Sequence, residues 1–251
     1  MATTPLFYKD KKATARPIWL EAFAGIDWIA LHASPVYYGL GVPRGNQSPV
    51  IVVPGFLGTD HYLAEMYHWL RRIGYKPYYS GIGWNADCLN TLTSLLMQTI
   101  EQGYRETGKK VHLIGHSLGG ILARAAALQQ PDKVASLITL GSPYRGVRSH
   151  PIVLQTAEAV RAKILSNRQK REYYPDCYTG YCTCNAITAL QTGVPDSILQ
   201  SAVYTKTDGI VDWRVCINDD PATDFEVKAT HVGLAFNPAV YHLIARRLAK
   251  A

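Results

Sequence analysis

Short apolar runs alternate along this chain with longer segments of helical periodicity, and this alternation strongly constrains the fold. The runs predicted as strands cover residues 49–54, 76–82, 110–115, 134–140, 202–207 and 224–228. Helices are predicted over 60–73 (with Asp60 as N-cap), 86–107, 118–130 and 238–248. Strands that alternate with helices favour an α/β fold, with a mostly parallel central sheet flanked by helices.

Composition limits the class of protein. The chain has 251 residues, of which 47% are hydrophobic and 18% charged, which is typical of a globular domain and excludes disordered, collagen-like and coiled-coil chains. The net charge is +7, but the basic residues form neither a stripe nor a recognition motif. We therefore expect a solvated basic surface and no nucleic-acid partner.

The N-terminal region, residues 1–48, is expected to be an arm followed by a helix. The apolar run 18–31 contains Glu21 and Asp27, and it is too short and too polar to cross a bilayer. It predicts an amphipathic or buried helix, and peripheral contact with a lipid interface stays open. The sequence as given shows no secretory signal, so the cytoplasm is the default expectation, while the cysteines keep a secreted or periplasmic protein open.

The pattern loosens between residues 144 and 195, which predicts an irregular cap set into the sheet domain of residues 49–251. This cap contains several tyrosines that, with Trp84, could line an acyl pocket or simply pack the segment. They are Tyr173, Tyr174, Tyr178 and Tyr181.

A serine flanked by glycines stands between a predicted strand and a predicted helix. The sequence Gly115-His116-Ser117-Leu118-Gly119 matches the pattern G-x-S-x-G. A serine on such a sharp turn projects from the sheet edge, near the positive end of the following helix, and small residues two before and two after it avoid a clash with the neighbouring backbone. The context therefore predicts a nucleophilic serine.

From about residue 49 onward the sequence resembles the α/β-hydrolases, and most of all their small bacterial lipases and esterases. The stretches that carry this resemblance are VPGFLG at 53–58, GHSLGG at 115–120, TLGSPYRG at 139–146, TDGIV at 207–211 and THVGL at 230–234. The resemblance implies the α/β-hydrolase fold, with the cap between the sixth and seventh strands of the family's sheet.

The order of the motifs suggests a catalytic triad. α/β-Hydrolases carry serine, then an acid, then histidine along the chain, and here this order gives Ser117, Asp208 and His231. Asp212 is the competing acid, but Asp208 directly follows the apolar strand, and Asp212 is expected to cap the next segment. The backbone N–H groups of Phe56 and Leu118 would form the oxyanion hole. Pro54 stands where lipases of this kind usually have histidine, so a local hydrogen bond is missing.

These residues together predict a serine carboxylic ester hydrolase that works through an acyl-enzyme, without metal or organic cofactor. The substrate would be a small-molecule or lipid ester and the protein a monomer. Two alternatives stay open, an acyltransferase with the same triad and a non-catalytic lipid-binding module.

The cysteines allow two interpretations. Cys177, Cys182 and Cys184 lie in the cap, Cys216 follows the acid loop, and Cys88 stands alone on a predicted helix. Their spacing is not typical of structural zinc sites. Either a disulfide ties the cap internally or to Cys216 while Cys88 stays reduced, or the clustered thiols are reduced and buried.

Overall fold

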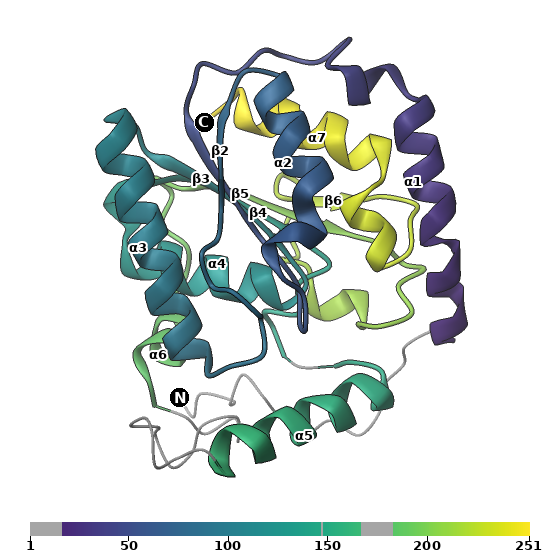
Figure 1. Ribbon diagram of the computed structural model, residues 1–251, viewed down its shortest axis with the longest axis vertical. Helices are drawn as coiled ribbons and strands as arrows, with labels where there is room; N and C mark the ends of the chain where they lie inside the picture. The colour runs from purple at the N-terminus through teal and green to yellow at the C-terminus, as the bar shows by residue number, and fades with distance from the viewer. Residues whose placement is uncertain (1–16, 147, 167–182) are drawn as a thin grey trace.

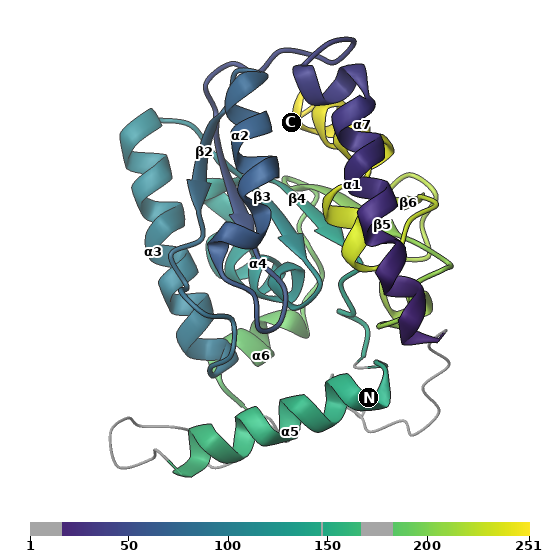
Figure 2. The same ribbon diagram turned by 45° about the vertical axis from the view of Figure 1, so that its right-hand side comes forward.

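The computed structural model describes residues 17–146, 148–166 and 183–251, and it contains one sheet (Figures 1 and 2). Its strands are β1 (Pro49–Val53), β2 (Lys76–Tyr79), β3 (Val111–His116), β4 (Val134–Leu140), β5 (Leu199–Tyr204) and β6 (Asp224–Glu226). Within the described ranges the sheet has six strands in the order β2-β1-β3-β4-β5-β6, and every neighbouring pair is parallel. The predicted parallel sheet flanked by helices is therefore confirmed.

Helices cover both faces of the sheet, which is why the central strands β1, β3 and β4 are buried at all but one position. The helices are α1 (Ala24–Ala33), α2 (Ala64–Arg72), α3 (Leu89–Thr107), α4 (Leu118–Gln129), α5 (Pro151–Ser166), α6 (Asn185–Leu190) and α7 (Pro238–Leu248). In β1, Ile51 and Val53 pack into the core with α3, α4 and α6, whereas Val50 and Val52 pack into the core with α2 and α7. Successive side chains along β1 thus point to opposite faces of the sheet and pack into two separate cores.

Two helix starts differ from the sequence-based expectation. Asp60 is not an N-cap, because a 3-10 turn (Asp60–Leu63) precedes α2 and the Asp60 carboxylate instead accepts from the backbone N–H groups of Ser80 and Gly81 at 2.9 and 3.2 Å. Helix α3 begins at Leu89, so Cys88 occupies its N-cap position rather than a helical turn. At α2 a 3-10 turn replaces the first turn of the predicted helix, whereas α3 begins three residues later than predicted.

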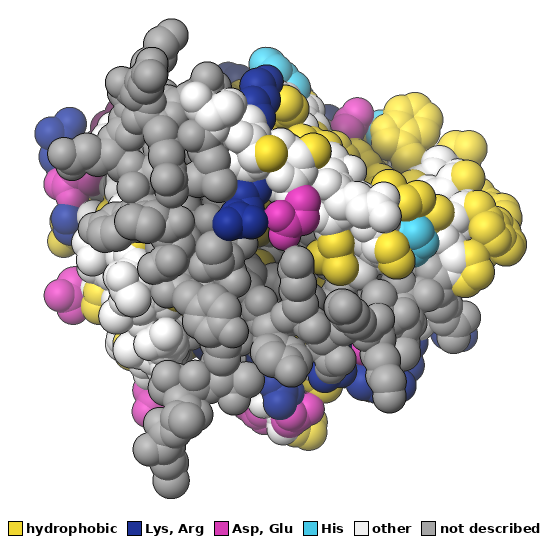
Figure 3. Space-filling view, turned by 90° about the horizontal axis from the view of Figure 1, so that it is seen from below, with side chains coloured by type: hydrophobic (Ala, Val, Ile, Leu, Met, Phe, Trp, Pro, Cys, Tyr) yellow, Lys and Arg dark blue, Asp and Glu magenta, His cyan; other side chains and the backbone are white. Residues whose placement is uncertain are grey.

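The N-terminal run forms a 3-10 turn (Ile18–Phe23) and then α1, which lies along α7 at the edge of the molecule (Figure 2). Most large apolar side chains of this segment face outward. Trp19, Phe23, Ile26 and Ile29 are 48 to 64% exposed, whereas Leu31 is its buried residue. Seen from below, hydrophobic side chains gather at this margin (Figure 3). No helix in the described ranges is both long and apolar enough to cross a membrane. The division of the chain at residue 48 stays a prediction.

The predicted cap follows β4 and precedes β5, and it is not wholly irregular. It contains α5, which lies below the sheet in Figure 1, and α6, which packs on α3 and α4. An isolated antiparallel bridge between Ser149 and Val211 joins the start of this segment to the loop after β5. The four tyrosines proposed for an acyl pocket lie outside the described residues, and Trp84 is 52% exposed.

Candidate active site

Ser117 occupies a strained turn between β3 and α4. Its backbone has φ 53° and ψ −124°, a conformation that non-glycine residues rarely adopt, and its N–H donates to the carbonyl of Leu140 at 2.8 Å. A Cβ on Gly115 would lie 2.4 Å from Cα of Gly120, and a Cβ on Gly119 would lie 2.3 Å from the carbonyl oxygen of Val53. The two glycines of the motif are therefore required by close backbone approach.

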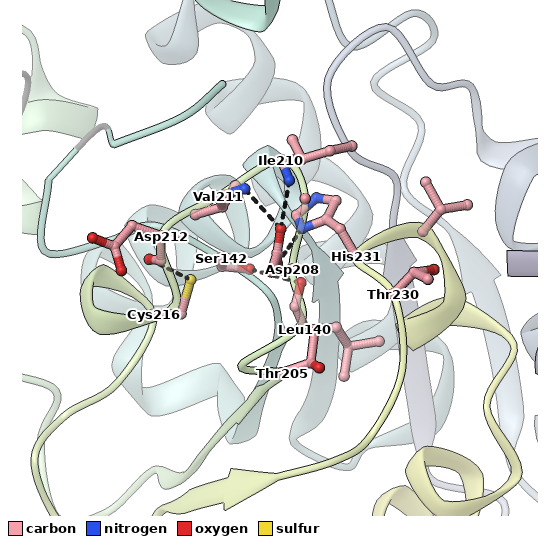
Figure 4. A network of polar contacts seen from close by, with 12 residues as sticks. Leu140, Ser142, Thr205, Asp208, Ile210, Val211, Asp212, Cys216, Thr230 and His231 are labelled. Carbon is pink, nitrogen blue, oxygen red and sulfur yellow. Dashed lines mark hydrogen bonds and ion pairs between the residues drawn. The ribbon is translucent and has the colours of Figure 1, made fainter. Parts of the chain in front are cut away.

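Asp208 and His231 meet in the buried region beyond the ends of β5 and β6 (Figure 4). The Oδ2 of Asp208 lies 2.7 Å from the Nδ1 of His231, and Oδ1 accepts from the backbone N–H groups of Ile210 and Val211 at 2.8 and 2.7 Å. These backbone bonds fix the carboxylate, so that one oxygen is left for the imidazole. Because β5 ends at Tyr204, Asp208 stands four residues beyond the strand rather than directly at its end.

Asp212 does not share this position. Its carboxylate accepts from the backbone N–H of Arg214 at 3.1 Å, as the cap of a short 3-10 turn (Trp213–Val215), and it forms ion pairs with Arg214 and Arg148. The expected capping role of Asp212 is confirmed.

The end of β4 lies between Ser117 and His231. Leu140 accepts from the Ser117 N–H, and a Cβ on the next residue, Gly141, would lie 3.1 Å from Nδ1 of His231. The structure therefore brings all three residues of the predicted triad to one end of the sheet.

His231 is 2% exposed, and its surroundings decide its protonation. Burial lowers the pKa of the imidazole, but the charge and hydrogen bond of Asp208, with a further contribution from the charge of Glu21, raise it more, so that the pKa is above its usual value. An imidazole whose Nδ1 is bonded to a carboxylate keeps Nε2 available for a proton from another group.

His116 is a second buried imidazole beside the first. Its Nε2 lies 2.9 Å from the carbonyl oxygen of His231, and the two ring centroids are 4.9 Å apart. Burial, and next the charge of His231, lower the pKa of His116 to about 3, so it is neutral at ordinary pH. A neutral His116 can donate from Nε2 to this carbonyl, and it thereby supports the backbone of His231.

The turn that carries Phe56 is held against the serine turn. A Cβ on Gly55 would lie 3.1 Å from Cβ of Ser117. Neither the Phe56 N–H nor the Leu118 N–H donates to another residue in the part of the chain that the structure describes. Leu118 is the first residue of α4, where backbone N–H groups lack helical acceptors. Both N–H groups are thus available to an anionic oxygen.

Asn85 supplies local hydrogen bonding to this turn, and sequence analysis missed it. Its buried side chain donates from Nδ2 to the carbonyl of Pro54 at 2.7 Å, while its backbone carbonyl accepts from the Leu57 N–H and its own N–H donates to Gly58, each at 2.9 Å. The signal available in the sequence was the polar Asn85 in a loop after an apolar strand. Sequence analysis also missed the contacts of Glu21, which are described below.

The cysteines and metal ligands add no second site among the residues that can be described. Cys216 is buried and free, its thiol lying 3.8 Å from the backbone carbonyl of Asp212, so the expected bridge to Cys216 is not formed. Cys177 and Cys182 lie outside the described residues, and a bridge within the cap stays a prediction. In the described ranges no three His, Cys, Asp or Glu side chains gather as a metal site.

The chain is similar in sequence to known proteins. Residues 49–194 match the family model of palmitoyl protein thioesterases. A triacylglycerol lipase of Burkholderia plantarii is 33% identical over 144 residues, which is 54% of this chain and 40% of that protein. A triacylglycerol lipase of Vibrio cholerae is 34% identical over 132 residues, which is 47% of this chain and 42% of that protein. The matched segments thus span less than half the length of these curated relatives.

Solved structures share the fold. A soluble variant of monoglyceride lipase from Saccharomyces cerevisiae aligns with a TM-score of 0.58 at 15% identity, over 83% of this chain and 90% of that one. A mature lipase of Bacillus licheniformis aligns with a TM-score of 0.52 at 15% identity, over 83% of this chain and 94% of that one. At this identity the likeness shows the fold alone.

Proposed function

Because this chain belongs to the palmitoyl protein thioesterase family and has the α/β-hydrolase fold, we propose that it is a serine hydrolase that cleaves carboxylic esters. The observation that carries this proposal is the buried contact between Asp208 and His231 next to a strained serine turn. The lipase relatives support the same reaction class.

In this mechanism the Ser117 hydroxyl attacks the carbonyl carbon of the ester while Nε2 of His231 takes the hydroxyl proton. Asp208 holds the Nδ1 tautomer and stabilises the imidazolium that forms. The N–H groups of Phe56 and Leu118 bind the negatively charged oxygen of the tetrahedral intermediate. His231 then gives its proton to the departing alcohol, and a water molecule activated by the same imidazole cleaves the acyl-enzyme.

Thioesters are the second candidate substrate class, and the match to the thioesterase family model favours them. The same nucleophile and oxyanion donors serve both carbonyl compounds, because only the leaving group differs. We do not favour acyl transfer or a non-catalytic role, since the relatives are hydrolases by name. We further propose that the protein acts as a monomer on small or lipid substrates.

A fluorophosphonate probe tests the proposal directly, because it reacts rapidly only with an activated hydroxyl. We expect one labelled serine, Ser117, in the native protein, and Ser117→Ala should abolish labelling and lower kcat by about 10⁴- to 10⁶-fold without unfolding the protein. Labelling that persists in the variant would refute the assignment. Matched nitrophenyl esters and acyl thioesters of increasing chain length, each measured with and without chelator, would identify the preferred class.

A further inference from the structure

The Glu21 carboxylate contacts both the loop after β5, which carries Asp208, and the loop after β6, which carries His231. Its Oε1 accepts from the backbone N–H of Gly209 at 2.9 Å and from that of His231 at 3.1 Å, and its Oε2 accepts from the Val232 N–H at 2.9 Å. One side chain from the N-terminal 3-10 turn thus bridges the residue after Asp208 and the first residues of the His231 loop.

We propose that Glu21 is a positioning residue that holds these two loops at the separation which the hydrogen bond between Asp208 and His231 requires. The proposal rests on the function proposed above. The two loops follow different strands, β5 and β6, so chain connectivity alone does not fix the distance between their tips. Hydrogen bonds to a charged acceptor are short and strong, and a shared carboxylate couples the two backbones directly.

Other contacts between the loops lie on their strand side. The hydroxyls of Thr205 and Thr207 donate to the carbonyl of Ala229, at 2.8 and 2.6 Å. These residues precede the catalytic residue of their loop, which is Asp208 in one loop and His231 in the other. Glu21 binds the backbone N–H of His231 itself and of the residue that follows each catalytic residue, Gly209 and Val232. The two loops are therefore connected twice, by the threonine hydroxyls on the strand side and by the Glu21 carboxylate on the other side. The pair formed by Asp208 and His231 lies between these two connections.

Local sequence makes room for the carboxylate. A Cβ on Gly209 would lie 3.0 Å from Oε1 of Glu21, closer than side chains normally approach, so glycine at 209 permits the contact. Inward-facing carboxylates also explain why the apolar side chains of the N-terminal segment face outward. Asp27 also points inward, where its Oδ1 accepts from the Asn237 side chain at 2.7 Å, and the apolar side chains are left outside.

Glu21 also acts on the imidazole through its charge. The charged and titratable groups that face His231 are Asp208, Glu21 and His116, and the Tyr62 ring packs on His116. The negative charge of Glu21 contributes to the raised pKa of His231. Removal of that charge should lower this pKa, whereas Asp27→Asn, which removes a charge that does not contribute to this pKa, should leave it unchanged.

The experiment compares Glu21→Ala and Glu21→Gln with Asp27→Asn as the matched control. Asp27→Asn removes one negative charge from the same inward face but leaves the contacts to Gly209, His231 and Val232 in place. Glutamine keeps one acceptor oxygen for Gly209 and His231 but turns an amide N–H₂ toward the Val232 N–H, so it should act more mildly than alanine. The full chain is used throughout, with a short-chain nitrophenyl ester as substrate.

We expect Glu21→Ala to lower kcat by about 10- to 100-fold with KM within about threefold, because a misplacement near 1 Å costs this much. The acidic limb of the profile of kcat against pH should move to lower pH in both Glu21 variants and not in Asp27→Asn. The Nδ1–H proton of His231, observed by ¹H NMR, should shift or broaden in Glu21→Ala. This signal does not depend on turnover, so it tests the inference even if the protein proves not to cleave esters.

Three results would overturn the proposal. Full activity in Glu21→Ala would remove any positioning role. Equal losses of kcat and of Tm in Glu21→Ala and Asp27→Asn, with unchanged pH limbs, would show that Glu21 only docks the helix. An unchanged Nδ1–H resonance in both Glu21 variants would show that the pair keeps its geometry without the carboxylate.

Discussion

The Oδ2 of Asp208 lies 2.7 Å from the Nδ1 of His231, with both side chains almost completely buried, while Asp212, four residues later, faces Arg214. Asp208→Asn should therefore keep the fold but lower kcat by about 10⁴-fold at neutral pH, because asparagine holds the wrong imidazole tautomer. Asp212→Asn should mainly lower stability, by at most about 1 kcal/mol, through loss of the ion pairs with Arg148 and Arg214, since asparagine still caps the turn. Steady-state kinetics and urea unfolding of both variants check this, and inactivity of Asp212→Asn alone would reverse the assignment.

The pH dependence of kcat/KM should follow His231. The imidazole must be neutral to accept a proton, and its pKa is raised above 6.5, so kcat/KM should rise with pH with a midpoint above 6.5. In Asp208→Asn the midpoint should move down. The stabilising contribution of the ionised pair should be complete below the unfolded-state pKa and should be lost as pH rises through the raised folded-state pKa. A midpoint below 6.5 in the native protein would contradict this prediction.

The oxyanion turn gives a prediction that separates side chain from backbone. Phe56→Leu should change kcat by less than about threefold, because the proposed donor is the backbone N–H. Asn85→Leu has a similar volume but leaves the Pro54 carbonyl without its 2.7 Å donor, so kcat should fall by up to about 10²-fold as the turn moves. Burst kinetics with a nitrophenyl ester would locate the loss in acylation, and the reverse ranking of the two variants would exclude Phe56 N–H as the donor.

The glycine after Leu118 should tolerate no side chain. In Gly119→Ala the new Cβ would lie 2.3 and 2.4 Å from the carbonyl oxygens of Val53 and Pro54, so the free energy of unfolding should fall by about 3 kcal/mol or more. Gly193→Ala is the matched control, since its Cβ would meet nothing within 4 Å, and it should change stability by less than about 1 kcal/mol. Urea unfolding of both proteins measures the difference, which a similar midpoint would disprove.

Cys216 should react slowly in the native protein. Burial, followed by the charges of Asp208 and Asp212, raises the pKa of its thiol well above its usual value, and the nucleophilic thiolate is therefore scarce. Iodoacetamide should label Cys216 only after unfolding. Peptide mapping without reductant should find Cys216 unbridged, and it would also test the predicted bridge within the cap, which involves Cys177 and Cys182.

The sequence predicted those features that local pattern controls. The strands, the glycine-flanked Ser117 and the position of α7 follow from apolar runs, a tight turn and a proline at a helix start, each readable over a few residues. Asn85 and Glu21 could not be predicted this way. Their hydrogen-bond partners lie 31 and up to 211 positions away in the sequence. The N-terminal helix also exposes its apolar side chains, against the rule that apolar faces turn inward. Such contacts depend on tertiary packing that no local window contains.

The backbone conformation that presents the Ser117 hydroxyl lowers the stability of the folded protein. Its positive φ costs on the order of 1 to 3 kcal/mol, and glycine alone would occupy this turn without that cost. A selection for heat resistance without a selection for turnover would therefore favour replacement of Ser117 by glycine and enrich inert, longer-lived proteins. Survival of Ser117 in a lineage is then a record of continued demand for the reaction, more than of demand for the fold.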